Sequence, residues 1–163
     1  MRRLLLVAAL VFALAGCGGG GSGQGSKEAK AAAARWATGL HAWGSGITRA
    51  LDGISVLFSR PADVRGIQAG DRRIGRILAR YERTLAGCSA RVERLGAAPA
   101  SSVLAKKEAL HACVSLEHAA VLIRSGVKEF QRGLGPDVLN STSDPLSVGE
   151  DGVRRALLDV SQG

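Results

Sequence analysis

The sequence is short of aromatic residues, prolines and cysteines, and these shortages exclude several classes of structure. Of its 163 residues only 4% are aromatic, with 4 Pro and 3 Cys. Such a composition excludes collagen, low-complexity chains and small scaffolds held by several disulfides. Hydrophobic residues make up 46% and charged residues 22%, which is typical of a globular chain with the length of one domain.

Acidic residues are also scarce, and no hydrophobic run is long. Lys and Arg outnumber Asp and Glu by 22 to 14, which gives a net charge of +8 spread through a globular composition. The apolar run from Leu4 to Ala15 has 12 residues, whereas a helix needs about 20 to cross a bilayer. A permanent single-span anchor is therefore the weaker interpretation of this run.

The first seventeen residues have the order of an export signal. Arg2 and Arg3 precede the apolar run, and Gly16 and Cys17 follow it. Leu14-Ala15-Gly16-Cys17 resembles the lipobox of bacterial lipoproteins, and the resemblance covers residues 1–17 only. It implies cleavage before Cys17, fatty acyl chains on that residue, and a lipid-anchored position on the extracytoplasmic side of a cell membrane. The alternative is an ordinary signal peptide in which Cys17 is incidental.

The sequence divides into three parts. Residues 1–16 are the predicted signal peptide, residues 17–26 a lipidated cysteine with a Gly/Ser tether, and residues 27–163 the folded domain. The tether is too polar and glycine-rich to bury apolar surface, and nine such residues reach roughly 15 to 18 Å. Two or three acyl chains on Cys17 would make the anchor durable.

The folded domain has helical periodicity throughout. Apolar residues recur at intervals of three and four in three long segments, roughly 29–57, 67–95 and 103–130, and in a short one at 146–160. We therefore predict an all-α antiparallel bundle of three long helices and a short C-terminal helix. The first helix is expected either to break near Gly44 and Gly46 or to use its glycines for close helix approach. Asp71, Ser101 or Ser102, and Asp144 are the predicted N-caps.

Two cysteines are left once Cys17 carries lipid. Cys88 and Cys113 lie on the apolar faces of helices predicted to form a hairpin, in a compartment where disulfides persist. We predict a structural disulfide between them, with two buried free thiols as the alternative. The sequence contains no CxxC spacing, which would indicate redox chemistry.

Motifs for catalysis or metal binding are missing. The sequence contains no HExxH, GxSxG, Walker or EF-hand pattern. Glu108 and His111 form a single Glu-x-x-His spacing, whereas a di-metal bundle needs two copies. His111 and His118 are about 10.5 Å apart along a helix, too far to share one ion. We expect a non-enzymatic protein without a cofactor or metal.

The strongest surface feature is an arginine-rich helix face. Residues 64–95 contain eight arginines against Asp71, Glu82 and Glu93. On a helical wheel the arginines lie within about 100°, opposite the apolar residues. Such a face suits anionic lipid head groups, an anionic polymer or an envelope protein, but not nucleic acid in this compartment. The candidate contact residues are Arg72, Arg73, Arg76, Arg80, Arg83, Arg91 and Arg94.

Three interpretations of the arginine face and two functions of the domain are open. The arginine face is either a binding surface for the cell envelope, or simply solvated, or partly neutralised by the acidic C-terminal residues 136–163. The leading hypothesis is a non-enzymatic lipoprotein with a binding or scaffolding role at the bacterial envelope. The alternative is a carrier of small apolar ligands with a cavity near Trp36 and Trp43, which otherwise belong to the core.

Overall fold

The computed structural model describes residues 22–134 and 141–162. The predicted signal peptide, the lipobox and Cys17 lie outside the described residues. Within them the chain is helical and contains no strand, which confirms the predicted all-α class. The elements are α1 (Ser22–Ser59), α2 (Pro61–Gln68), α3 (Arg72–Ala86), α4 (Cys88–Glu93), the 3₁₀ turn η1 (Ala100–Ser102), α5 (Val103–Gln131) and α7 (Ser143–Gln162).

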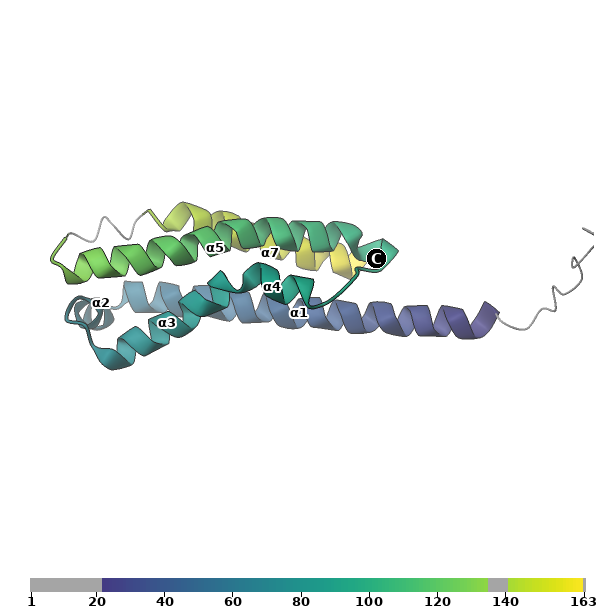
Figure 1. Cartoon of the computed structure of the whole chain (residues 1–163), viewed down its shortest axis with the longest axis horizontal. Helices are drawn as coiled ribbons and strands as arrows, with labels where there is room; N and C mark the ends of the chain where they lie inside the picture. Colours follow the sequence, from purple (N-terminus) through teal and green to yellow (C-terminus); the bar gives the residue numbers. More distant parts are fainter. Residues whose placement is uncertain (1–21, 135–140, 163) are drawn as a thin grey trace, which may run out of the picture.

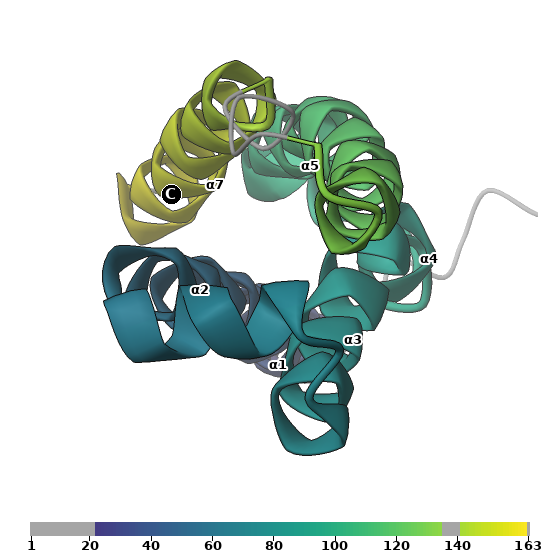
Figure 2. The ribbon, with the colours of Figure 1, turned by 90° about the vertical axis from the view of Figure 1, so that its left-hand side faces the viewer.

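Four antiparallel rods form the bundle. They are α1, α3 continued by α4, α5, and α7, and each runs opposite to the rod before it (Figure 1). Viewed from the end, α1 with α2, α3 with α4, α5, and α7 occupy four corners, and α7 lies diagonally across from α3 (Figure 2). The C-terminal helix, predicted to be short, has 20 residues against 29 in α5.

The first helix is longer than predicted and extends past the rest of the bundle. It begins at Ser22, so the last five residues of the predicted tether belong to a helix of 38 residues. Its N-terminal part, shown in purple in Figure 1, projects beyond the other rods. Residues 26–32 are exposed, and Trp36 is the first buried side chain.

The expected break near Gly44 and Gly46 is wrong, because α1 runs without interruption from Ser22 to Ser59. The other expectation, close helix approach, is correct at Gly44. A Cβ atom there would lie 2.8 Å from Cδ1 of Leu157 on α7. The glycine is thus explained by packing, and the surrounding contacts hold the helix straight where propensity alone would weaken it.

Asp71 is confirmed as the N-cap of α3. Its side chain accepts hydrogen bonds from the backbone N–H groups of Arg73 at 2.7 Å and Ile74 at 3.0 Å. The preceding turn uses Gly70 with a φ of 72°, a conformation that glycine adopts without strain. The residues before it, 61–68, form the separate short helix α2, which starts at Pro61.

Of the two other predicted caps, Ser102 is correct in position only, and Asp144 is wrong. Ser102 takes the N-cap position of α5, but its side chain makes no capping hydrogen bond, because the 3₁₀ turn η1 leads directly into the helix. The last helix begins at Ser143, so Asp144 lies within its first turn instead of capping it. An acidic side chain there still suits the positive end of the helix dipole.

The predicted single helix from residue 72 to 95 is interrupted at Gly87. α3 ends at Ala86, and α4 starts at Cys88. Glycine is a poor helix former, and two contacts with α5 fix the chain directly after it. The backbone N–H of Ser89 donates to Oε1 of Glu117 at 2.9 Å, and Cys88 is covalently bound to Cys113.

The disulfide and a continuous apolar core hold the rods together. The Sγ atoms of Cys88 and Cys113 are 2.04 Å apart, and their Cα atoms are 5.2 Å apart, so the predicted disulfide is confirmed. Both cysteines are fully buried. The largest of the fully buried side chains are Leu40, Ile47, Ile54, Leu85, Leu116 and Ile123.

Candidate anion-binding site

The seven predicted arginines lie on α3, on α4 and directly after α4. Six of the seven are exposed and Arg91 is half-buried. The opposite side of the same rod buries Leu78, Leu85 and Val92 in the core. We call the seven residues the arginine face: Arg72, Arg73, Arg76, Arg80, Arg83, Arg91 and Arg94.

The acidic side chains of this rod are all engaged with other groups. Asp71 caps α3. Glu82 accepts a hydrogen bond from Nε of Arg124 on α5 at 2.7 Å, and Glu93 pairs with Lys106 at 3.0 Å. Within residues 22–134 and 141–162, no member of the arginine face lies within 4.0 Å of a carboxylate oxygen. The positive charge of the face is therefore not compensated by ion pairs in the described part of the chain.

The acidic C-terminal helix does not neutralise the arginine face. α7 lies at the opposite corner of the bundle from α3 (Figure 2). Its acids Glu150 and Asp151 pair with Arg154 of the same helix, at 3.4 and 3.7 Å. The expectation that α7 shields the face is thus wrong as far as its described residues are concerned.

A basic pocket lies where the arginine face meets α1. Arg80 of α3 and Arg91 of α4 line one wall of the pocket, and Arg49 of α1 lines the other. Arg80 precedes the interruption at Gly87, and Arg91 follows it. Its cavity volume is about 460 Å³, and its lining contains no carboxylate. We call it the arginine pocket, and its lining residues are Gly46, Arg49, Ala50, Arg80, Tyr81, Thr84 and Arg91.

Arg49 was missed by the sequence analysis. It is an isolated cation on α1, and helical periodicity places it beside the apolar face without indicating which rod it meets. In the structure its Nε donates to the backbone carbonyl of Ser45 at 3.2 Å. This contact orients the guanidinium, and its two terminal nitrogens have no hydrogen-bond partner among residues 22–134 and 141–162.

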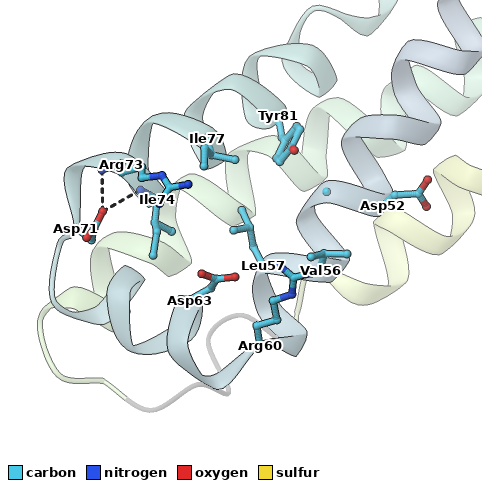
Figure 3. A pocket seen from close by; sticks show the side chains of 11 residues that line it. Asp52, Val56, Leu57, Arg60, Asp63, Asp71, Arg73, Ile74, Ile77 and Tyr81 are labelled. Atoms are coloured by element: carbon cyan, nitrogen blue, oxygen red, sulfur yellow. Dashed lines mark hydrogen bonds between the residues drawn. The ribbon is translucent and has the colours of Figure 1, made fainter.

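A second pocket lies at the end of the bundle between α1, α2 and α3. It measures about 530 Å³ and shares Tyr81 with the arginine pocket. Arg60 and Asp63 project toward the same space as Ile74 and Ile77 (Figure 3). Its lining carries three aspartates and two arginines, so charges of both signs offset one another and favour no single ligand charge. Asp71, at its edge, is already used as the helix cap.

Two ionisable groups are shifted by their contacts. The backbone N–H groups of Ile74 and Arg73 lower the pKa of Asp71, and the charges of Arg73 and Arg76 add to this. The hydrogen bond and charge of Glu82 raise the pKa of Arg124. Both shifts strengthen the charged forms that cap α3 and connect it to α5.

The described residues contain no group of three or more His, Cys, Asp or Glu side chains placed to hold a metal. His41, His111 and His118 are exposed. Glu108, the acid of the Glu-x-x-His spacing, instead accepts from Nε of Arg155 on α7 at 3.4 Å.

The structure separates the two tryptophans. Trp36 lines an open groove of about 580 Å³ between α1 and the segment that joins α4 to α5, mostly among alanines. Trp43 is not part of that lining, and both tryptophans are 5% exposed. Their indole N–H groups are buried without a hydrogen-bond partner in the described part of the chain.

None of the helices in residues 22–134 and 141–162 combines the length and hydropathy required of a membrane span.

Comparison with protein-family models, with curated proteins and with solved structures gives no match for this chain.

Proposed function

We propose that this protein is a lipid-anchored, extracytoplasmic and non-enzymatic binding protein that holds a phosphate-bearing polymer of the bacterial cell envelope. The observation that carries the proposal is the arginine face, whose seven cations have no ion-pair partner among the described residues. The acidic side chains of the same rod instead cap α3 or pair with basic residues of α5. A row of uncompensated cations along a rigid helix suits an extended polyanion.

The anchor in this proposal is Cys17, on the strength of the lipobox-like Leu14-Ala15-Gly16-Cys17. The projecting start of α1 then acts as a spacer between the membrane and the bundle. From Ser22 to Trp36 it spans about 21 Å at a rise of 1.5 Å per residue. It would hold the arginine face above the lipid surface.

The anchor is tested by the intact mass of the protein extracted from membranes. Cleavage before Cys17 with added acyl mass is the expected result. A Cys17→Ser variant should leave the membrane fraction. An unprocessed chain in the aqueous fraction would contradict the anchor.

Polymer binding is tested with poly(glycerol phosphate) and detergent-extracted protein. One variant replaces Arg72, Arg76 and Arg83 together by glutamine. The matched control makes the same replacement at Lys107, Lys128 and Arg132, which are exposed on α5 or just after it. The arginine variant should lose binding, and the control should retain it. Wild-type binding should also weaken with salt. Equal losses in both variants would show dependence on net charge alone and contradict the proposal.

A second candidate function is a carrier of apolar ligands, favoured by the groove beside Trp36. Its alanines, Leu95 and Trp36 offer an apolar surface to such a ligand. A fatty acid should then change the fluorescence of the wild type and of a Trp43→Phe variant, but not of Trp36→Phe. Fluorescence that ignores the ligand in all three proteins would exclude this candidate.

A further inference from the structure

We infer that the arginine pocket is a discrete site for one phosphate group. Because Arg80 and Arg91 belong to the arginine face, the inference rests on the proposed function, which assigns that face to phosphate-bearing polymers. It goes further by naming one place where a single phosphate binds, and by including Arg49 from a different helix.

Arginines of three helices line the pocket. Arg49 comes from α1, Arg80 from α3 and Arg91 from α4. None of them lies within 4.0 Å of a carboxylate among the described residues. Guanidinium groups donate paired hydrogen bonds that match the oxygens of a phosphate, and they are always charged.

Two further polar residues line the pocket. The hydroxyl oxygen of Tyr81 lies over Gly53 of α1, 2.6 Å from where a Cβ atom would be, and Gly53 lines the second pocket. Thr84 uses its own hydroxyl proton on the backbone carbonyl of Arg80 at 3.1 Å. With no carboxylate in the lining, the pocket offers donors and positive charge, and its volume of about 460 Å³ admits a phosphate with a small substituent.

Gly46 belongs to the lining of the pocket and contributes no side chain to it. Gly39, Gly44 and Gly53 of α1 are each explained by packing, because a Cβ atom would lie within 3 Å of Leu95, Leu157 and Tyr81 respectively. At Gly46 a Cβ atom would meet nothing within 4 Å, and φ is not positive there. A glycine inside a helix is unfavourable relative to alanine. Packing and backbone geometry do not require it, but it keeps the floor of the arginine pocket open.

The pocket owes its position to the interruption at Gly87. Arg80 and Thr84 precede the interruption and Arg91 follows it. The disulfide at Cys88 and the hydrogen bond from Ser89 to Glu117 fix the restarted helix on α5. The side chain of Arg91 is therefore presented to α1 by a rigid support, which lowers the cost of ordering it around a ligand.

The test compares two glycine-to-glutamate variants in the full, membrane-extracted chain. Gly46→Glu places a carboxylate in the pocket. Gly75→Glu makes the same charge change on α3, where a Cβ atom also meets nothing within 4 Å, but outside the pocket. Binding of inorganic phosphate is measured by calorimetry. We expect Gly46→Glu to weaken it at least about tenfold and Gly75→Glu to leave it within about twofold.

A second variant tests the pocket without changing Gly46, in case Gly46→Glu does not fold. Arg49→Gln with Arg91→Gln removes two donors and leaves the glycine in place, and it should also weaken phosphate binding at least about tenfold. Circular dichroism checks the helix content of every variant. Wild-type binding that is undetectable, or that both pocket variants retain, would overturn the inference.

Two further arms separate the sources of the phosphate and the two proposals. Dimethyl phosphate represents the diester of a polymer, and inorganic phosphate represents a free ion. Binding of both assigns the pocket to polymer diesters, and binding of inorganic phosphate alone assigns it to a free ion. The Arg72, Arg76 and Arg83 variant should lose poly(glycerol phosphate) but keep inorganic phosphate, so failure of the polymer proposal is distinguishable from failure of the pocket.

Discussion

Glu117 on α5 accepts a hydrogen bond at 2.9 Å from the backbone N–H of Ser89, at the start of α4. The bond crosses the bundle one helical turn from the disulfide, since Glu117 follows Cys113 by four residues. It gives a partner to one of the amide groups that a restarted helix leaves unpaired. The carboxylate and the disulfide together attach the start of α4 to α5.

Replacing Glu117 by alanine should destabilise the protein by about 1 to 2 kcal/mol, because the half-buried amide loses a charged acceptor. Glu117→Gln keeps an acceptor oxygen and should recover part of the loss. Glu129→Ala, on the same helix and without a side-chain hydrogen bond in the described chain, is the control. Urea denaturation measures all three. An equal loss at residues 117 and 129 would show that the contact contributes nothing.

Removal of the disulfide should cost more than removal of Glu117. Cys88 and Cys113 are separated by 25 residues. Opening a loop of this size restores unfolded-state entropy worth about 3 to 4 kcal/mol. We expect the Cys88→Ala, Cys113→Ala variant to unfold at lower urea concentration. Reductant should shift wild type toward the variant and leave the variant unchanged. A midpoint that does not depend on reductant would contradict this.

Periodicity predicted the bundle well because it reports burial. The intervals of three and four placed Trp36, Leu40 and Ile47 on one face of α1, and all three are buried in the core. Asp71 and the cysteine pair were predictable for a similar reason, since capping and pairing depend on neighbours along one helix or one hairpin.

Contacts between rods could not be predicted in the same way. The break expected near Gly44 fails because Leu157, from the far end of the sequence, packs against that glycine. The end of α3 at Gly87 depends on Cys113 and Glu117 of α5. Arg49 could not be predicted as part of the site either, because only the packing of α1 on α3 and α4 brings it to the pocket of Arg80 and Arg91.

The Asp71 cap should make stability depend on pH in acid. Because the folded-state pKa of Asp71 is lowered, its contribution is present above the unfolded pKa of about 3.9 and is lost as the pH falls through the folded value. Asp71→Asn keeps a capping oxygen without the charge. The unfolding temperature of the wild type should be higher than that of the variant near neutral pH. The difference between the two temperatures should shrink in acid. A difference that stays constant down to the lowest pH would contradict the assignment.

Gly53 and Gly75 should respond to alanine in opposite directions. A Cβ atom at Gly53 would lie 2.3 Å from Cζ of Tyr81, so alanine must displace the ring and should cost about 1 to 3 kcal/mol. At Gly75 the same change meets nothing within 4 Å and should stabilise α3 by about 0.5 to 1 kcal/mol through helix propensity. In a Tyr81→Ala background the cost at Gly53 should disappear, because the obstructing ring is gone. Thermal denaturation of the single and double variants measures this coupling. An additive result would mean that the ring of Tyr81 does not cause the cost of alanine at Gly53 and would contradict this prediction.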